Sequence, residues 1–351
     1  MLGRMSPRVA LLTPFAHPSV RGNAVTVARI ARGLRERSVE LRVWDLSVEP
    51  EARVEAEVEA YAPSLVHAFH AYRTGPLALR LARRAELPLV VTLTGTDANH
   101  DLFDVERAAV VRHVLEGASR VTVFHASIAD RVAGALPDLR GRLVVVPQGA
   151  RFEPGGAFDL DARVALPPDA ALFLFPAGIR PVKRPLLPLG PLGRLAARRP
   201  EVRLLYAGPV LDRDEGDALL RALAERPWAR HLGAVPHAQM ASLLARADVV
   251  LNCSISEGGM ANSVLEALAL GRAVLAADIE GNRSLIEDGV TGLLFRDEAE
   301  LERQAERLIA DPALRARLGA AGRLRVERSY PPAREVDGYL DVYRRLVRVS
   351  A

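Results

Sequence analysis

The sequence contains very little cysteine, since Cys253 is the only one among 351 residues. A single cysteine cannot form an internal disulfide bond, which argues against a disulfide-stabilised secreted domain and favours a reducing compartment. No apolar run approaches the ~20 residues of a membrane-spanning helix, and Met1–Pro7 lacks the apolar core of a signal peptide. We therefore expect a cytoplasmic protein without a membrane span.

Several motifs that define other classes of protein are absent as well. No GxGxxG segment follows the first predicted strand, which removes the main support for a nicotinamide dehydrogenase. The sequence contains no P-loop, no HExxH zinc motif and no CxxC pair. The net charge is only +4 and no block of five like charges occurs, so nucleic acid is not expected as a partner.

Lysine and asparagine are also rare. Of the 47 basic residues only Lys183 is lysine, and the chain has five asparagines: Asn23, Asn99, Asn252, Asn262 and Asn282. This bias is typical of a GC-rich genome that replaces both residue types wherever the chemistry is indifferent. The lysine and asparagines that remain are therefore candidate functional residues, and the alternative is that they remained by chance. A compact ammonium and a forked guanidinium bind phosphate differently, which makes Lys183 the strongest candidate.

Short apolar runs alternate with helical patterns along the whole chain. The runs are apolar almost throughout, which is typical of strands in a parallel sheet covered on both faces. The alternation predicts an α/β protein with two doubly wound, Rossmann-like domains, over residues 1–150 and 165–330. We expect the Gly-, Pro- and Asp-rich segment Gln148–Pro168 to link them, and a C-terminal helix over residues 335–351 to pack back on the N-terminal domain.

The predicted elements are as follows. Strands are expected at Val9–Thr13, Leu41–Leu46, Leu65–Phe69, Leu89–Leu93, Arg120–Phe124, Leu143–Val146, Leu172–Ala177, Val202–Tyr206, Ala247–Asn252, Ala273–Ala276 and Gly292–Phe295. Helices are expected, among others, at Ala24–Arg37, Ala238–Ala245 and Asn262–Leu270.

The strongest candidate site lies at Asn252–Glu266, where a strand ends, a Ser/Gly-rich loop follows and a helix begins. Backbone N–H groups at such a helix start are unpaired and point at a docked anion. Gly258 and Gly259 allow a bulky diphosphate to approach the backbone closely. Glu257 in the loop and Glu266 one turn into the helix face the same space, and Glu266 can reach a ribose diol. The alternative is an ordinary helix N-cap at Asn262 or Ser263 beside a solvated Glu257.

A second candidate site follows the first strand of the C-terminal domain, at Gly178–Pro185. Ligands of doubly wound sheets bind outside the carboxyl ends of strands, so this loop and the Glu257 loop are expected to share one crevice. Arg180 and Lys183 would then supply two cations to one diphosphate. Stabilising a departing diphosphate is the electrostatic work that such a site performs.

In the N-terminal half, four residues after predicted strands are candidate site residues: His70, Arg73, Thr96 and Asp97. His67 lies within an apolar strand, where a buried core histidine and a site residue are both open. Asp97 is either the N-cap of a following helix or a base that contacts a bound substrate.

Several of these segments occur in one order that resembles a known family. They are the GxRPVK segment of Gly178–Lys183, Gly208-Pro209, His231–Gly233 and the run SEGGMANSVLEALALGRAVLAADIEGNRSLIEDGVTGLLF ending at Phe295. Together they resemble the donor domain of the GT-B glycosyltransferases, specifically family 4. The segments GNAVT, HAFHAYRTG and TGTD of the N-terminal half are similar to a short-chain subset. That subset includes the glycosyltransferase-1-domain-containing protein and the selenosugar synthase of selenoneine biosynthesis.

The resemblance implies a GT-B fold, with two domains facing across a cleft, and roles for individual residues. Glu257 and Glu266 match the glutamates of the EX7E motif, here spaced nine positions apart instead of eight. Glu257 is implied to lie near the donor sugar and Glu266 on the ribose. Arg180 and Lys183 match the diphosphate-binding pair, and His231–Gly233 is implied to lie near the nucleobase. The implied donor-binding residues are Gly22, Asn23, Arg180, Lys183, Gly233, Glu257, Gly258, Gly259, Met260, Ala261, Asn262 and Glu266.

The implied reaction is transfer of a hexosyl or N-acetylhexosaminyl group from a nucleotide-sugar, most simply a UDP-sugar, with retention of configuration. The implied catalytic residues are Glu257, Arg180, Lys183 and His70. The candidates for the acceptor side are His70, Arg73, Thr96 and Asp97. No metal and no cofactor are required, because Arg180, Lys183 and the helix N-terminus can neutralise the diphosphate. Two alternatives stay open. One is transfer to a selenium or sulfur nucleophile such as selenophosphate, and the other is a non-catalytic sugar-nucleotide-binding protein.

Overall fold

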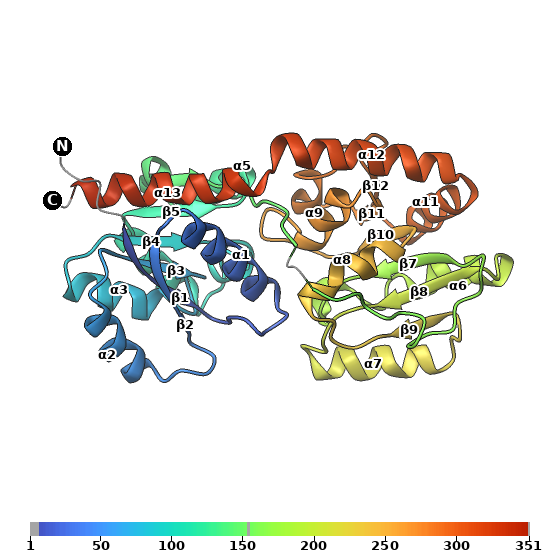
Figure 1. Ribbon diagram of the computed structural model, residues 1–351, viewed down its shortest axis with the longest axis horizontal. Helices are drawn as coiled ribbons and strands as arrows, with labels where there is room; N and C mark the ends of the chain where they lie inside the picture. The colour runs from blue at the N-terminus through green and yellow to red at the C-terminus, as the bar shows by residue number, and fades with distance from the viewer. Residues whose placement is uncertain (1–6, 153–154, 350–351) are drawn as a thin grey trace. The chain divides into compact units, whose positions relative to one another are not determined.

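The computed structural model describes residues 7–152 and 155–349. The chain divides into two compact units. Unit 1 consists of Met1–Gly149 with Pro332–Ala351, and unit 2 consists of Ala150–Pro331. Each unit contains one six-stranded sheet whose paired strands are all parallel (Figure 1). The predicted fold class, two doubly wound α/β sheets, is therefore confirmed.

The sheet of unit 1 has the strand order β2-β1-β3-β4-β5-β6. Its strands are β1 (Arg8–Thr13), β2 (Glu40–Asp45), β3 (Leu65–Phe69), β4 (Leu89–Thr92), β5 (Arg120–Val123) and β6 (Leu143–Val145). The connecting elements are α1 (Gly22–Glu36), α2 (Glu51–Tyr61), α3 (Gly75–Arg84), η1 (Asp97–Asp101), α4 (Ala108–Gly117), α5 (Ala126–Ala135), η2 (Pro137–Arg142) and the C-terminal α13 (Pro332–Val349).

Both faces of the sheet are buried at its central strands, which explains why β1, β3 and β4 are almost entirely apolar, whereas the edge strand β2 carries exposed Glu40 and Arg42. Along β1, Val9 and Leu11 point to the core shared with α1 and α13. Ala10 and Leu12 point to the opposite core, which is formed with α2, α3, α4 and α5.

Helix α13 packs against α1 through two specific contacts. Arg29 of α1 forms a two-pronged ion pair with Glu335 (2.8 and 2.9 Å), and both side chains are buried. Gly33 faces Val336, whose Cγ2 lies 2.2 Å from the position that a Cβ on residue 33 would occupy. The C-terminal helix thus belongs to unit 1, although the whole of unit 2 separates it from the rest of that unit in sequence.

The sheet of unit 2 has the strand order β12-β11-β10-β7-β8-β9. Its strands are β7 (Ala171–Phe175), β8 (Val202–Tyr206), β9 (Ala229–His231), β10 (Val249–Asn252), β11 (Ala273–Ala277) and β12 (Leu293–Phe295). The other elements are η3 (Pro181–Lys183), α6 (Leu189–Arg198), α7 (Arg213–Ala224), α8 (His237–Arg246), α9 (Asn262–Ala269), α10 (Glu280–Arg283), α11 (Glu298–Ala310) and α12 (Pro312–Ser329).

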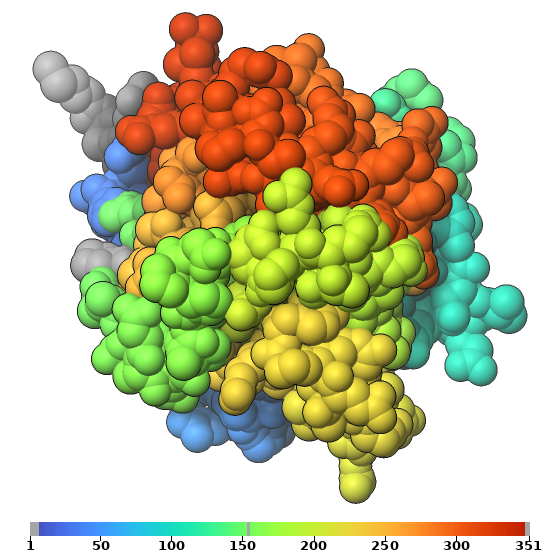
Figure 2. All heavy atoms as spheres, turned by 90° about the vertical axis from the view of Figure 1, so that its right-hand side faces the viewer, coloured from blue at the N-terminus to red at the C-terminus, as the bar shows by residue number. Residues whose placement is uncertain are grey.

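The outer helices of unit 2 carry many of the abundant arginines. Arg194 and Arg198 of α6 both pair with Glu302 of α11 (2.6 and 3.0 Å). The space-filling view in Figure 2 shows α6, in yellow-green, and α11, in red-orange, forming one continuous surface. These arginines are half-exposed, so such pairs are solvated and contribute little to stability.

The structure differs from the sequence-based expectations in three places. Strand β9 was not predicted, because only one of its three residues, Ala229, is apolar and buried. Helix α1 begins at Gly22 instead of Ala24, so Gly22 and Asn23 lie in its first turn and not in a preceding loop. The expected linker Gln148–Pro168 packs in part against α8 of unit 2: the amide of Phe158 donates to Ser242 Oγ (2.7 Å), and Asp161 pairs with Arg246 (3.0 Å).

His67 is a core histidine that joins α13 to the sheet of unit 1. It has no exposed surface, and its ring nitrogens lie 2.6 Å from the Tyr343 hydroxyl and 2.7 Å from Thr92 Oγ1. Burial lowers the pKa of His67 to about 3.

Within the described chain, no helix is both long and apolar enough to cross a membrane.

The buried imidazole makes the stability of unit 1 depend on pH. Unfolded His67 gains a proton below its ordinary pKa of 6.5, whereas the folded ring does not until about pH 3. The stabilising contribution is therefore complete above pH 6.5 and is lost as the pH falls toward 3, by about 1.4 kcal/mol per pH unit. We expect His67→Gln, measured by urea unfolding between pH 7 and 4.5, to reduce the slope of the unfolding free energy by that amount. An unchanged slope would contradict a neutral buried His67.

Candidate functional site

The strand order of unit 2 defines one topological switch point. The chain moves from β7 to β8 and β9 on one side, then returns to β10 on the other side of β7. In open α/β sheets, ligands bind outside the carboxyl ends of the strands at such a point. The loops after β7 and β10 are the two segments that the sequence analysis selected.

The structure brings these two loops into contact. Lys183 Nζ lies 2.5 Å from Glu257 Oε1, and both side chains are largely buried. The amide of Ile255 donates to the carbonyl of Val182 (2.9 Å), and Arg184 Nε donates to the carbonyl of Cys253 (2.7 Å). The two loops that were expected to share one crevice are therefore in direct contact.

Glu257 is held by more than Lys183. Its Oε1 also accepts hydrogen bonds from Ser254 Oγ (2.6 Å) and Asn252 Nδ2 (3.1 Å). Burial opposes ionisation of this carboxyl, but the charge of Lys183 and these hydrogen bonds outweigh it and hold the pKa of Glu257 below its ordinary value. The alternative of a solvated loop carboxylate is wrong, because Glu257 is a fixed, ionised group.

Two further residues complete this support and were not assigned a role from the sequence. Asn282 Nδ2 donates to Asn252 Oδ1 (3.2 Å) and so orients the amide that holds Glu257. Gly281 faces Glu257 so closely that a Cβ on residue 281 would lie 2.5 Å from the Cβ of Glu257. The rarity of asparagine had marked Asn252 and Asn282 as candidates, although without a function.

The loop between Glu257 and α9 has the backbone geometry that an anion site needs. Gly259 has φ +99°, a conformation that favours glycine. The N-cap residue of α9 is Ala261, whose side chain makes no capping hydrogen bond. An N-cap at Asn262 or Ser263 is therefore not what the structure shows, since α9 begins at Asn262. Gly258 and Met260 lie in this same loop.

Glu266, one turn into α9, has a partner that sequence reasoning missed. His237 Nε2, at the start of α8, lies 2.8 Å from Glu266 Oε1. The His237 ring stacks on Phe152 with ring centroids 6.4 Å apart and an angle of 13° between the planes. Glu266 is only 6% exposed, so His237 fixes the direction of its carboxylate.

The remaining residues of unit 2 that were predicted to bind the donor lie at the same edge of its sheet. Arg180 is exposed and precedes η3. Gly233 follows β9 with φ +77°, and its carbonyl accepts a hydrogen bond from the amide of Gly208 (2.9 Å). His231 Nε2 lies 2.8 Å from the carbonyl of Gly208, so the loops after β8 and β9 are joined.

Unit 1 has its own switch point, between β1 and β3. Asn23, in the first turn of α1, donates through Nδ2 to Thr94 Oγ1 (3.2 Å). His70 follows β3 with φ +82°, is 3% exposed, and accepts the amide hydrogen of Arg73 on Nδ1 (3.3 Å). In the neutral ring the proton is therefore on Nε2, which lies 3.8 Å from Asp101 Oδ2.

Asp97 connects the loops after β3 and β4. Its Oδ1 accepts from the amides of Thr94, Gly95 and Ala98 (2.9, 2.9 and 3.1 Å), and its Oδ2 accepts from the amide of Ala71 (2.9 Å). With no exposed surface, Asp97 holds the backbone of both loops in place. Thr96, beside it, is exposed.

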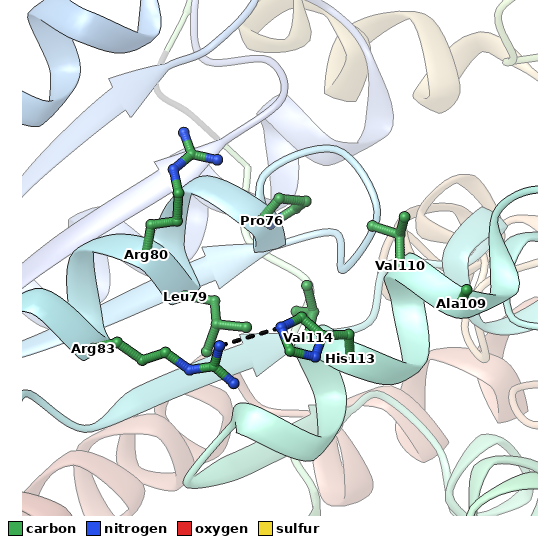
Figure 3. A pocket seen from close by; sticks show the side chains of 8 residues that line it. All are labelled: Pro76, Leu79, Arg80, Arg83, Ala109, Val110, His113 and Val114. Carbon is green, nitrogen blue, oxygen red and sulfur yellow. Dashed lines mark hydrogen bonds between the residues drawn. The ribbon is translucent and has the colours of Figure 1, made fainter.

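A surface hollow of about 430 Å³ lies elsewhere on unit 1, between α3 and α4 (Figure 3). Its walls are mainly apolar, with Arg83 hydrogen-bonded to His113 across it (3.2 Å). None of the residues predicted from the sequence lines this hollow.

Within the described residues, no three His, Cys, Asp or Glu side chains are arranged to hold a metal ion.

Comparison with known proteins identifies the class. A family model described as Glycosyl transferase-like matches residues 191–341. The chain is 32% identical over 306 residues to a D-inositol 3-phosphate glycosyltransferase of Frankia alni, covering 77% of this chain and 72% of the relative. It is 27% identical over 326 residues to Glycosyltransferase 1 domain-containing protein 1 of Xenopus tropicalis, covering 91% and 92%.

Solved structures agree on the fold. The Anabaena protein Alr3699/HepE, crystallised with UDP and glucose, superposes with a TM-score of 0.79 at 17% identity, covering 96% of this chain and 99% of that one. Sucrose-phosphate synthase of Thermosynechococcus elongatus gives 0.79 at 19% identity, covering 97% and 100%. The chain therefore belongs to the glycosyltransferases of GT-B fold. It is a glycosyltransferase.

The Lys183–Glu257 pair should show strong energetic coupling. Removing one partner of a buried ion pair leaves an uncompensated charge and costs about 3–5 kcal/mol. We expect Lys183→Met alone to destabilise unit 2 by about that amount, and the double variant Lys183→Met/Glu257→Gln to recover much of the loss. Denaturant unfolding of the parent, both single variants and the double variant measures the coupling. Arg194→Ala on α6 is the control, and additive effects would show that the pair is not formed.

Proposed function

We propose that the protein transfers a hexosyl or N-acetylhexosaminyl group from a UDP-sugar to an acceptor, with retention of anomeric configuration and without a metal ion. The observation that carries this proposal is the Lys183–Glu257 pair at the switch point of unit 2, beside the start of α9. The pair supports the proposal because a cation, an ionised carboxylate and a helix N-terminus are groups that can bind a diphosphate and the hydroxyls of a sugar. The complexes of Alr3699/HepE with UDP and with UDP-glucose support the choice of donor.

Each donor group has a proposed partner in unit 2. Arg180, Lys183 and the first turn of α9 receive the diphosphate, whose growing charge they stabilise as the sugar leaves. The diphosphate approaches the backbone of the loop and helix start that are formed by Gly258, Gly259, Met260, Ala261 and Asn262. Glu257 accepts hydrogen bonds from sugar hydroxyls, Glu266 accepts from the ribose diol, and Gly233 lies beside the nucleobase.

Retention is proposed to occur by displacement on one face of the sugar. The bond from C1 to the phosphate oxygen breaks, the acceptor atom bonds to C1 from the same side, and the released diphosphate takes the acceptor proton. The engagement of Glu257 supports this route. One of its oxygens already accepts hydrogen bonds from Lys183, Ser254 and Asn252, which suits a hydrogen-bond acceptor better than an attacking nucleophile.

Unit 1 is proposed to receive the acceptor, with His70, Arg73 and Thr96 nearest to it and Asp97 holding their loops. Gly22 and Asn23 are proposed to contact the donor phosphates from the first turn of α1. The single, buried cysteine supports action in a reducing cytoplasm. A selenium or sulfur nucleophile is the alternative acceptor.

The test combines donor binding with product stereochemistry. UDP-glucose and UDP-N-acetylglucosamine are screened by thermal shift, where a ligand at 100 times its Kd adds about 2.7 kcal/mol to the unfolding free energy. Slow donor hydrolysis is then followed by proton NMR, with and without EDTA. We expect the α-anomer to form first and EDTA to have no effect. First formation of the β-anomer would refute retention, and the absence of any shift with uridine nucleotides would refute the donor.

Glu266 gives a specific prediction for the ribose contact. A hydrogen bond to a charged group contributes about 1.5–3 kcal/mol, so Glu266→Gln should weaken UDP binding by that amount. Calorimetric titration with UDP and with 2′-deoxy-UDP measures it, and the loss on removing the 2′-hydroxyl should be smaller in the variant than in the parent. Equal losses in both proteins would place Glu266 away from the ribose. Glu302→Gln, on the outer surface of unit 2, serves as the control.

A further inference from the structure

Two arginines at the switch point of unit 1 share one aromatic ring. The guanidinium carbon of Arg21 lies 4.1 Å from the centre of the Phe15 ring, and that of Arg73 lies 5.6 Å from the same centre. Phe15 and Arg21 belong to the loop after β1, and Arg73 belongs to the loop after β3. These strands are neighbours in the sheet, and the switch point lies between them.

The carboxylates of the surrounding loops already bind other groups. Asp97 accepts four backbone amides, Asp101 pairs with Arg107 (3.0 Å), and Asp45 accepts the amide of Ala16 (2.7 Å). Among the residues that the structure describes, no carboxylate lies within 4.0 Å of the guanidinium of Arg21 or Arg73. Their positive charges are therefore oriented by the ring and are not neutralised.

The loops that carry these arginines are fixed at their bases. The Thr13 hydroxyl donates to the carbonyl of Phe15 (2.9 Å), and the amide of Arg73 donates to the ring of the buried His70 (3.3 Å). A phosphoryl group has several terminal oxygens and can accept forked hydrogen bonds from two guanidinium groups at once. A neutral hydroxyl compound can accept single hydrogen bonds from the guanidinium groups, but it lacks the negative charge and the paired oxygens that a phosphoryl group offers.

We propose that Arg21 and Arg73, held on Phe15, bind a phosphoryl group of the acceptor. This inference rests on the proposed function, since it names the acceptor class of the same enzyme. The phosphoryl group can belong to a phosphate ester of a hydroxyl compound or to an inorganic oxyanion that is itself the nucleophile. Both present the same chemistry to the two arginines.

The test fills the donor site first. With the protein saturated by UDP, isothermal titration measures binding of glycerol 3-phosphate, of inorganic thiophosphate and of uncharged glycerol. We expect the two anions to bind and glycerol not to bind. Arg21→Gln and Arg73→Gln should each weaken anion binding about tenfold or more, as expected for hydrogen bonds to a charged group. Arg73→Lys, which keeps the charge without the fork, should recover only part of the affinity.

Arg140→Gln is the matched control, because Arg140 is an exposed arginine of unit 1 outside these loops. Unchanged melting temperatures without ligand exclude misfolding of the variants. Preference for glycerol 3-phosphate over thiophosphate identifies an ester, and the reverse identifies the oxyanion. Equal anion affinity in the parent and both glutamine variants would overturn the proposal. So would anion binding that UDP abolishes, because the arginines would then serve the donor diphosphate. If UDP itself does not bind, the proposed donor is refuted, and the anion titrations of the parent and the variants still test this proposal.

Discussion

The contact between Lys183 and Glu257 is the interaction on which the switch point of unit 2 depends. It joins the loops after β7 and β10 across the switch point, and neither loop has regular structure of its own beyond the short η3 turn. Because burial penalises an isolated charge, each side chain requires the other. The position of the loop that leads into α9 therefore follows from an ion pair, supported by Ser254, Asn252 and the space that Gly281 leaves.

In unit 1, the loops at the switch point are held by one carboxylate that binds main-chain amides. Asp97 gathers amides from the loops after β3 and β4, so its charge is dispersed over backbone dipoles and needs no basic partner. The left-handed backbone of His70 is kept by its surroundings, since its amide donates to the carbonyl of Thr92 (2.9 Å). Strained backbone of this kind persists only where neighbouring contacts determine it, and it concentrates at functional sites.

The sequence predicted the strands and the two loops well, because buried parallel strands and helix starts leave local signals. It could not show partners that come from distant segments. His237 looks like an ordinary helix-start residue, and only the fold brings it to Glu266. The rarity of asparagine was informative for Asn252 and Asn282, which hold each other and Glu257. This rarity alone does not distinguish an asparagine that holds a carboxylate from an asparagine that binds a ligand. Lys183 shows the same limit, since its pairing with Glu257 was not foreseen.

The two units hold their cations by different means, and this difference has an electrostatic consequence. An ion pair fixes the flexible side chain of Lys183 but offsets much of that side chain's charge. An aromatic ring fixes a guanidinium through its quadrupole and leaves the net charge in place. Phe15 therefore orients Arg21 and Arg73 without reducing the positive potential at the end of the unit 1 sheet. Of these two contacts, only the one on Phe15 leaves the positive charge uncompensated, which is why the proposed acceptor, and not only the donor, is expected to carry a negative charge.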